Sequence, residues 1–479
     1  MSNSLCLLFL STLIFFANFT YPEKVFTTPE NCMDCHRVFY DNWSQTMHSS
    51  SAKDPYFIAK LSSEVTFAGN FIEKECAKCH TPKATIEAKI EKKEVIILSN
   101  GFLSESNEFH RFAISGISCT LCHQIKRNGI SGNYSVDLNY RKPERAIYGP
   151  FIPLYGIEMY RSSGYFPTRS ENFLKADFCS SCHVVYTPTI ENGSVISYFP
   201  EQTTFFEWHN SVYNPEKPCQ SCHMKKERFK ISTKPGNLFE RNAKHHHFSG
   251  ANSQILSILG KNEGAKRAEE VLKSSAKIRI KSLNINENEL EIVVEIENKA
   301  GHKFPTGFPS RRAIVHLVVE DEGGIVFESG KILGDGRVVG EDYPERHYEL
   351  IDSEDEVQIY ESVMMSRDGR VTFDLLKAYR YFKDNRILPK GFSFLSAHPD
   401  TLPVGVEDDN FSPGSDKITY LVKKSFKKPI KVKVELLYQP ISFFFVESLR
   451  ETKEGVEFRE LIKKTDLTTL VDSDETIIQ

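Results

Sequence analysis

The first half of the chain carries five copies of the motif Cys-x-x-Cys-His. In each motif, two thiols three residues apart can reach the two vinyl groups of one porphyrin as thioethers, and the adjacent imidazole can bind the iron as its proximal ligand. Zinc sites and disulfides also use paired cysteines, but neither needs a histidine after every pair. The motifs therefore predict five covalently attached haem c groups, held by the thiols of Cys32, Cys35, Cys76, Cys79, Cys119, Cys122, Cys179, Cys182, Cys219 and Cys222 and by the imidazoles of His36, His80, His123, His183 and His223.

Haem iron also has a sixth position, and the group that fills it decides between electron transfer and catalysis. A histidine outside a motif is more often a surface or hydrogen-bonded residue than a metal ligand, so each needs further evidence. The candidates are His48, His110, His209, His245, His246, His247, His302, His316, His347 and His398.

The N-terminal stretch from Leu5 to Phe16 is apolar and has the length of a secretion signal. We expect residues 1–20 to be an export signal that is removed. An uncleaved N-terminal anchor is the alternative, and lipidation of Cys6 fits the surrounding residues less well. Haem c is attached outside the cytoplasm, so we expect a periplasmic or extracellular protein. No later segment is long and apolar enough to span a membrane.

The 479 residues, of which 26% are charged and 40% hydrophobic, indicate a globular protein of two or three domains. The formal net charge is -4, and haem propionates would make the holoprotein more acidic. Nucleic acid is therefore excluded as a partner. We expect redox donor and acceptor proteins or quinone-linked complexes instead.

The pattern of residues divides the chain into two main regions. Residues 21–250 hold all five motifs and few periodic segments, which predicts a mainly α-helical and irregular domain organised around its haems. Helix-forming residues with opposite charges at helical spacing, from Ala265 to Leu272, predict a connector helix within 251–275. The apo form is not expected to fold.

Period-2 alternation then predicts an all-β, antiparallel, sandwich-like domain over residues 276–450. The expected strands lie at 278–281, 290–296, 313–319, 325–327 and 430–436. Residues 334–415 read as a long, turn-rich insertion with one helix from Thr372 to Lys383. We expect residues 451–479 to be a charged, loosely held tail.

Several segments resemble the multihaem cytochromes related to the tetrahaem electron acceptor of hydroxylamine oxidoreductase, the cytochrome c-554 type. They are Cys32 to His48 with its Trp43-Ser44, Gly116-Ile117-Ser118 before Cys119, Glu207-Trp208 before Pro218-Cys219, and His247-Phe248-Ser249-Gly250. The loop Gly301-His302-Lys303-Phe304-Pro305-Thr306-Gly307, with Arg311-Arg312 and Asp384-Asn385-Arg386, resembles a β-module often fused to such haem domains.

The resemblance implies distal haem ligands. His48 matches a histidine that ligates a haem other than its nearest in sequence, His110 matches one ahead of a central haem, and His247 matches a third, with His245 and His246 close by. His302 could reach a fourth haem from the β-domain, although its loop also reads as a simple turn. His209 is the candidate for a fifth haem or a solvent-facing residue. His316 alternates within a strand and reads as a sheet residue, and Met47, Met224, Met364 and Met365 are weaker candidates.

Five haems with five distal histidines would suit an exported electron carrier, which is the function we expect. One alternative is a multihaem oxidoreductase that acts on a small nitrogen or sulfur species at one open haem. Another is a subunit of an extracellular cytochrome filament or surface complex, in which the β-domain makes the contacts.

Overall fold

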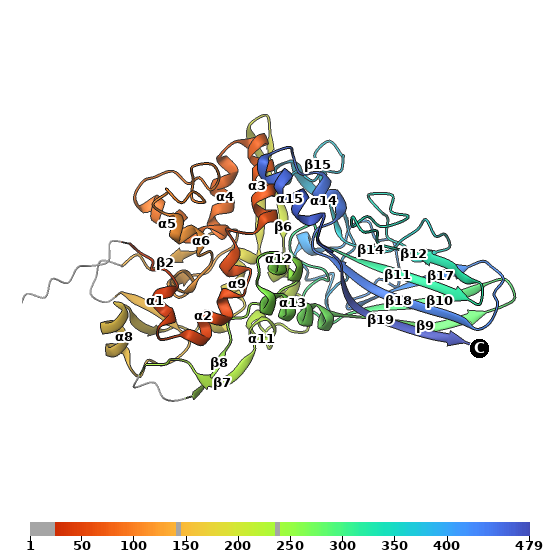
Figure 1. Cartoon of the computed structure of the whole chain (residues 1–479), viewed down its shortest axis with the longest axis horizontal. Helices are drawn as coiled ribbons and strands as arrows, with labels where there is room; N and C mark the ends of the chain where they lie inside the picture. Colours follow the sequence, from red (N-terminus) through yellow and green to blue (C-terminus); the bar gives the residue numbers. More distant parts are fainter. Residues whose placement is uncertain (1–23, 140–144, 235–239) are drawn as a thin grey trace, which may run out of the picture.

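The computed structural model describes residues 24–139, 145–234 and 240–479. The motif-bearing half, built of short helices and hairpins, lies at one end of an elongated molecule, and the β-sheet half lies at the other (Figure 1). The predicted export signal at residues 1–20 falls outside the described residues. No helix in the described ranges has the length and apolar character needed to cross a membrane.

The described residues of the motif half form thirteen helical segments. The long helix α3 shows how local sequence sets their ends: the Asp54 carboxylate accepts hydrogen bonds from the backbone N–H groups of Tyr56 and Phe57, Pro55 occupies the first turn, and Gly69 ends the helix at a positive φ of 62°. The segments are α1 (Glu30–Met33), α2 (Arg37–Ser44), η1 (His48–Ser50), α3 (Pro55–Ala68), α4 (Phe71–His80), α5 (Pro82–Ile90), α6 (His110–Ile114), α7 (Cys119–Cys122), α8 (Gly156–Ser163), η2 (Asn172–Leu174), α9 (Asp177–His183), α10 (Thr204–His209) and α11 (Cys219–His223).

Four two-stranded sheets in the described residues complete this half, and in three of them both strands directly follow a motif helix. Three are antiparallel: β1 (Ile125–Arg127) with β2 (Ser135–Val136), β5 (Val185–Glu191) with β6 (Ser194–Gln202), and β7 (Lys226–Lys230) with β8 (Glu240–Lys244). The fourth is parallel and pairs β3 (Ala146–Gly149) with β4 (Phe166–Arg169). The prediction of a mainly helical region is therefore confirmed for residues 31–124, and the described strands of the motif half all lie after residue 124.

The predicted connector forms two helices, α12 (Ser253–Ile258) and α13 (Asn262–Ser275). Gly260, at a positive φ of 71°, lies in the turn between them. Ala265, Ala268 and Leu272 are buried on one face of α13, as the periodicity predicted.

The β half contains two main sheets that share one hydrophobic core. In β10 and β18 every second residue is buried, which is the period-2 pattern that the sequence predicted. One sheet has the order β13-β17-β10-β9 and the other β12-β11-β18-β19, with β14 paired to β11; only β13 runs parallel to its neighbour. The strands are β9 (Ala276–Ile285), β10 (Leu290–Asn298), β11 (Arg312–Asp321), β12 (Gly324–Ser329), β13 (Leu350–Ile351), β14 (Ile359–Tyr360), β17 (Ser415–Val422), β18 (Ile430–Gln439) and β19 (Thr469–Ile478).

The helix predicted from Thr372 to Lys383 is wrong. The structure has a single 3-10 turn, η3 (Leu375–Lys377), followed by strand β16 (Ala378–Asp384), which pairs with β15 (Ser362–Ser366). The buried Glu64 carboxylate of α3 accepts the backbone N–H groups of Leu375 (2.8 Å) and Leu376 (3.4 Å) and so fixes the turn. Pairing with β15 then overrides the local helical pattern. The last short segment of this insertion is η4 (Pro399–Thr401).

The expectation of a loosely held C-terminal tail is also wrong. Helix α14 (Phe443–Glu447) is followed by α15 (Lys453–Ile462), and strand β19 pairs with β18 from Tyr438 to Ile430. The carboxylates of Asp472 and Asp474 accept the backbone N–H groups of Ile278 and Ile280 in β9, each at 3.0 Å. The charges that suggested a solvated tail thus bind the exposed edge of the other sheet.

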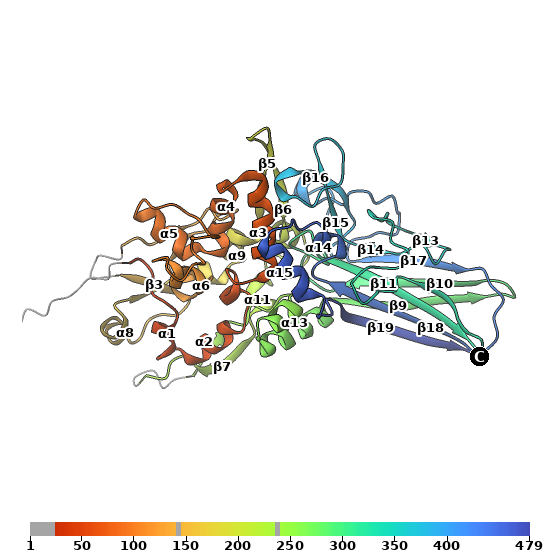
Figure 2. The same cartoon turned by 45° about the horizontal axis from the view of Figure 1, so that its top comes forward.

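The two halves pack through α3 and α15, which lie side by side in both views (Figure 2). Ser62 donates a hydrogen bond to Glu454 at 2.8 Å, and the rings of Tyr56 and Phe458 have centroids 5.3 Å apart. The C-terminal segment therefore returns to the motif half.

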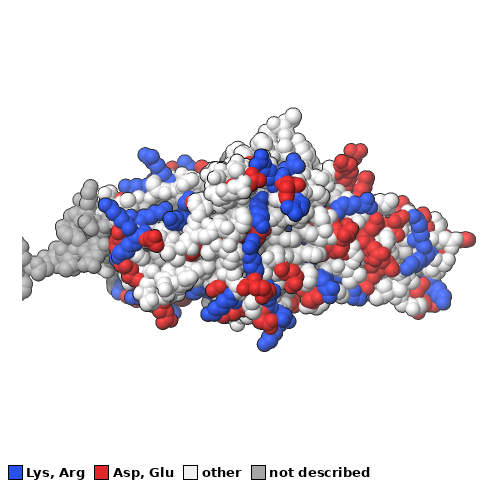
Figure 3. Space-filling view, turned by 90° about the horizontal axis from the view of Figure 1, so that it is seen from above, with Lys and Arg blue, Asp and Glu red and all other residues white. Residues whose placement is uncertain are grey.

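Basic and acidic side chains are interspersed over most of the face drawn in Figure 3, and acidic side chains gather over part of the β half. This distribution agrees with the slightly negative net charge of -4.

We predict that Asp474→Ala speeds hydrogen exchange at the Ile280 amide by about tenfold, since one lost hydrogen bond costs roughly 1–1.5 kcal/mol. Hydrogen exchange resolved to single amides measures this. Glu475→Ala is the matched control, because its exposed carboxylate only pairs with Lys431. Equal protection of Ile280 in the wild type and in Asp474→Ala would contradict the role of this carboxylate.

Candidate haem-binding site

Each motif lies on or at the end of a short helix. In α4, Cys76 and Cys79 lie three residues apart on one face of the helix, and His80 is its last residue. Motif 1 turns at the end of α1, where the His36 N–H donates to the Cys32 carbonyl at 2.8 Å. All ten motif cysteines are free thiols, so each pair can form two thioethers. Cys6 falls outside the described residues.

The histidine after each cysteine pair is oriented by its other ring nitrogen. A metal-bound imidazole typically donates its second N–H to a carbonyl or carboxylate, which fixes the ring and leaves Nε2 for the metal. Four of the five motif histidines place Nδ1 on a backbone carbonyl: His36 on Ile231 (2.7 Å), His80 on Ser51 (2.9 Å), His123 on Tyr148 (2.5 Å) and His223 on Ser249 (2.6 Å). Each acceptor belongs to a different segment of the chain.

Three motif histidines face a second histidine at a metal-bridging separation. A histidine nitrogen binds a transition metal at about 2.0–2.1 Å, and it lies about 1.1 Å from its ring centre, so two imidazoles on opposite sides of one metal have centroids about 6.3 Å apart. The observed separations are 6.3 Å for His48 and His183, 6.2 Å for His123 and His246, and 6.3 Å for His223 and His302. The donor sets therefore fit a bis-imidazole iron at motifs 3, 4 and 5.

Within the run of three histidines, His246 is the one that faces a motif. The rings of His245 and His247 stack with centroids 5.0 Å apart and planes at 3°, while His246 points to the other side and stacks toward His123 at 17°. Both nitrogens of His245 are engaged, by Asn42 (2.7 Å) and Glu227 (2.9 Å). The structure thus places His246, not His247, opposite a motif histidine.

Burial lowers the pKa of the imidazoles of His48, His123, His183, His246 and His302, which favours the neutral form that binds a metal. It lowers the pKa of His48 and of His246 to about 3 and that of His183 to about 4. The next largest cause is a neighbouring imidazole: His183 for His48, His123 for His246 and His223 for His183. These rings lie close enough together to repel one another if charged.

Two other predicted ligands, His110 and His209, do not lie with their rings 6.2–6.3 Å from the ring of a motif histidine. His110 begins α6 and places Nδ1 on the Phe102 carbonyl at 3.1 Å, the same tautomer-fixing contact that the motif histidines make. His209 ends α10, exposed, with its ring 6.1 Å from that of Phe205. His316 lies in β11 with both nitrogens bound to glutamates, Glu435 and Glu328, so its interpretation as a sheet residue is confirmed.

His347 is engaged in a separate buried cluster of the β half. Its Nε2 lies 3.1 Å from Asp408 and 3.7 Å from Asp416, while the amide nitrogens of Gln358 and Asn385 point at its Nδ1. Because two amide donors face Nδ1, the proton of the neutral ring resides on Nε2 and bonds the carboxylates. We therefore interpret this cluster as a hydrogen-bond network of the core.

Thiols from different motifs lie close enough to shift one another's pKa. Hydrogen bonding from the Cys119 thiol raises the pKa of Cys32, that from Cys79 raises the pKa of Cys182, and that from Cys219 raises the pKa of Cys179. The attachment points of motifs 1 and 3, of motifs 2 and 4, and of motifs 4 and 5 are therefore adjacent.

The loop of residues 129–134, between β1 and β2, holds three motif helices together. The N–H groups of Ser131 and Gly132 donate to the carbonyls of Val184 and Ser181, both at 2.8 Å, beside motif 4. The Tyr134 hydroxyl donates to the Lys78 carbonyl, inside motif 2, at 3.0 Å. Because the loop itself follows motif 3, it fixes the attachment helices of motifs 2, 3 and 4 relative to one another.

The two tryptophans of the chain each make the same kind of hydrogen bond. The Trp43 indole N–H donates to the Ile117 carbonyl at 2.7 Å, and the Trp208 indole N–H donates to the Lys217 carbonyl at 2.9 Å. Each acceptor lies two residues before the first cysteine of a motif, Cys119 or Cys219, and both indoles are nearly buried, at 7% and 8% exposure. Each tryptophan therefore fixes the start of an attachment helix, a role that the sequence alone did not reveal.

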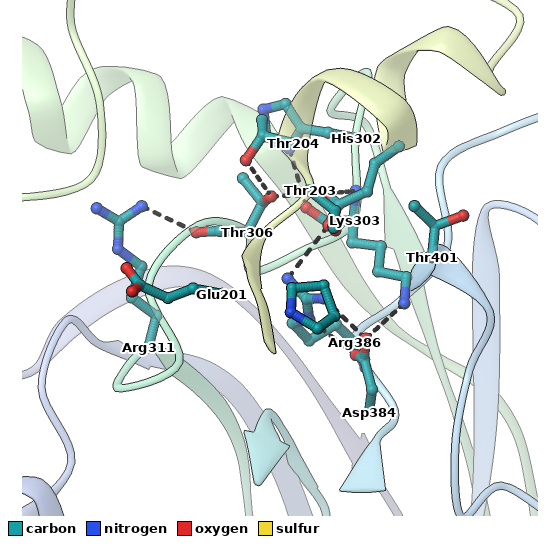
Figure 4. Close-up of polar contacts among 12 residues, drawn as sticks. Glu201, Thr203, Thr204, His302, Lys303, Thr306, Arg311, Asp384, Arg386 and Thr401 are labelled. Carbon is teal, nitrogen blue, oxygen red and sulfur yellow. Dashed lines mark hydrogen bonds and ion pairs between the residues drawn. The ribbon is translucent and has the colours of Figure 1, made fainter. Parts of the chain in front are cut away.

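His302 is held by a buried network of charges between the two halves (Figure 4). The adjacent Lys303 forms an ion pair with Asp384 at 2.7 Å, and Arg386 bonds the same carboxylate through two nitrogens, each at 2.7 Å. Although burial raises it, the charges of Arg386 and Lys303 lower the pKa of Asp384 to about 2. All three side chains are 0–3% exposed.

Glu207 of α10 links this network to the motif half. Its carboxylate accepts the Lys303 backbone N–H at 3.1 Å and the Thr306 hydroxyl at 2.6 Å, and it lies 3.3 Å from Arg386. The loop that carries His302 is therefore fastened on both sides before its imidazole faces His223. Removing one partner of such a buried pair would leave an uncompensated charge, at a cost of roughly 3–5 kcal/mol.

Comparison with known proteins finds one family model and one solved structure that resemble this chain. Residues 31–124, which include the first three motifs, match the family model for cytochrome c554 and c-prime. A penta-haem cytochrome c552 from Thermochromatium tepidum has a similar structure, with a TM-score of 0.58 over 94% of this chain and 99% of that chain, at 16% sequence identity. No curated protein matches the chain. The resemblance of residues 31–124 to multihaem cytochromes of the c554 type is confirmed, and the chain shares the fold of the penta-haem cytochrome.

We predict that Trp208→Phe lowers the fraction of protein with haem attached at Cys219 and Cys222, since the start of α11 loses its fixed carbonyl contact. Intact-protein mass spectrometry after limited proteolysis locates the missing haem. Trp43→Phe should affect Cys119 and Cys122 instead, so each variant controls for the other. Equal losses at all motifs in both variants would indicate general destabilisation and contradict the local role.

Proposed function

We propose that this protein is an exported cytochrome that holds five haem c groups and carries electrons between redox partners. The observation that carries the proposal is the set of three histidine pairs whose rings are 6.2–6.3 Å apart. This separation is what a bis-imidazole iron requires, and an iron with both axial positions filled is closed to substrate.

Thioethers to the five cysteine pairs would hold the haems, and His36, His80, His123, His183 and His223 would be the proximal ligands. Haem iron, when bound, supplies reversible one-electron chemistry. The residues of the chain would supply the rest: His48, His246 and His302 would hold the iron from the distal side, and the carbonyls that bind Nδ1 of His223, His246 and His302 leave Nε2 of these rings for a metal.

The contacts between motifs support a continuous relay. Adjacent thiols join motif 1 to motif 3, motif 2 to motif 4 and motif 4 to motif 5. Cys122 of motif 3 also lies near both cysteines of motif 4, where its charge raises their pKa after the larger effects of hydrogen bonding and burial. We infer an order 1-3-4-5, with motif 2 as a branch from motif 4.

The β half takes part in this function through His302. We propose that its two sheets form a sandwich-like domain that supplies one distal ligand and is fixed to the haem half by the Glu207 network. Its partners would be redox donor and acceptor proteins or quinone-linked complexes outside the cytoplasm.

A second candidate function is catalysis at one open haem, and the surroundings of motif 2 favour it. The thiol of Cys76 is buried near the carboxylates of Glu201 and Glu64, and its pKa is raised by burial and then by these two charges. Burial also raises the pKa of Glu201. A buried carboxyl group with a raised pKa is suited to donate a proton to a small nitrogen or sulfur species.

We predict that His246→Ala converts one low-spin haem to high spin without loss of haem, because one iron loses an axial imidazole. His247→Ala, the neighbouring residue, should leave the spectrum unchanged. Electron paramagnetic resonance at low temperature, with haem content from the pyridine haemochrome assay, measures both. A high-spin haem in His247→Ala and none in His246→Ala would overturn the assignment.

We also predict that the intact mass of the purified protein equals that of the processed chain plus five haems, and that replacing both Cys219 and Cys222 by serine removes one of them. A full complement of five haems in the double variant would contradict covalent attachment at motif 5.

A further inference from the structure

A solvent-reachable cavity of about 300 Å³ lies beside motif 1. It is formed where the segment before α1, helix α2, the segment η1, helix α6 and the turn between α12 and α13 meet, so it lies within the motif half. Its lining is part polar and part apolar, and none of its residues is a motif cysteine or histidine: Thr28, Pro29, Glu30, Tyr40, Trp43, Ser44, Ser49, Lys53, Arg111, Ile114, Ser115 and Lys261.

Three cationic side chains line this cavity and only one anionic one does. Lys53, Arg111 and Lys261 contribute positive charge, and Glu30 is the single carboxylate. Within the described parts of the chain, no carboxylate lies within ion-pair distance of any of the three cations. Lys261 instead donates to the Ser44 carbonyl and to the Ser49 hydroxyl, the latter at 3.0 Å. The cavity is therefore locally positive in a chain whose net charge is -4.

The positive charges of Lys53 and Lys261 repel each other across the cavity. Burial, and then the charge of Lys53, lower the pKa of Lys261 to about 8. Burial also lowers the pKa of Lys53, although Glu30 partly offsets this. Like charges held together without counter-charges favour an anion, because its arrival removes their repulsion and restores the charged form.

We propose that this cavity is a binding site for a small oxyanion or carboxylate. Arginine and lysine donate charge-assisted hydrogen bonds to such groups, and Arg111 offers the fork that matches a carboxylate. The cavity volume admits a sulfate-sized anion with room for water.

The anionic group that binds in this cavity has two alternative sources. One is a free anion from solution. The other is a propionate of a haem held near motif 1, since Glu30 precedes Cys32 by two residues and Tyr40 lies close enough to Cys119 for that thiol to raise its pKa, after the larger effects of burial, Glu30 and Arg37. The second source rests on the proposed function, whereas the first does not.

Calorimetric titration of the holoprotein with sulfate at low ionic strength tests the proposal, because sulfate does not ligate haem iron. The variants are Lys53→Met and Arg111→Met, and the control is Lys266→Met, an exposed lysine of α13 that does not line the cavity. For a free anion we expect saturable binding that Lys53→Met and Arg111→Met each weaken by about tenfold or more, through the loss of a charged hydrogen bond, and that Lys266→Met preserves.

If the occupant is a haem propionate, sulfate will not bind saturably, and spectroelectrochemical titration will show a lower midpoint potential for one haem in Lys53→Met and Arg111→Met but not in Lys266→Met. A lost cation destabilises the reduced haem and lowers its potential. Sulfate binding that all three variants retain, or no binding and no shift in potential, would overturn the proposal. Haem content, measured in parallel, distinguishes this failure from failure of the proposed function.

Discussion

A metal ion between two imidazoles fixes the distance between their rings, and much of this molecule is arranged to meet that distance. The three facing pairs join segments far apart in the sequence: the turn η1 with helix α9, the strand end after β8 with the segment after α7, and the loop before β11 with helix α11. The backbone carbonyls on Nδ1, the two indole contacts and the loop of residues 129–134 all serve to hold these imidazoles or their attachment helices in place. Haem binding and folding are coupled in such an arrangement, since each iron would join two distant segments.

The β half also helps to position one of these imidazoles, that of His302. Two buried cations and two buried carboxylates, Lys303, Arg386, Asp384 and Glu207, bind the loop that carries His302 to α10 and β16. Such a network costs desolvation energy and specifies geometry more than it adds stability. The segments around Glu207, His302 and Asp384, which lie far apart in the sequence, therefore meet at a single site.

The sequence predicted the attachment chemistry and the main strands because both depend on local spacing. Five identical motifs define five thiol pairs, and period-2 alternation defines β10, β11 and β18. His48 and His302 followed from the resemblance, and both face motif histidines. His246 could not be separated from His245 and His247 by residue type, although an extended chain sends every second side chain to the opposite side, and that rule singles out the middle residue.

Where local sequence patterns predicted the wrong structure, contacts with distant residues determined the observed one. The segment at 372–383 has an apolar pattern that suits a helix, but Glu64 and strand β15, both far away in sequence, impose a turn and a strand. The charged C-terminus forms β19 because β18 offers a free edge and β9 offers free N–H groups to its aspartates. The role of the two tryptophans likewise depends on acceptors that only the fold brings near them.

The most direct test of the account is a count of low-spin haems. Electron paramagnetic resonance of the oxidised holoprotein, integrated against total haem, should show at least three low-spin haems that nitrite and hydroxylamine leave unchanged. Fewer than three such haems would contradict the claim that His48, His246 and His302 close the irons opposite His183, His123 and His223.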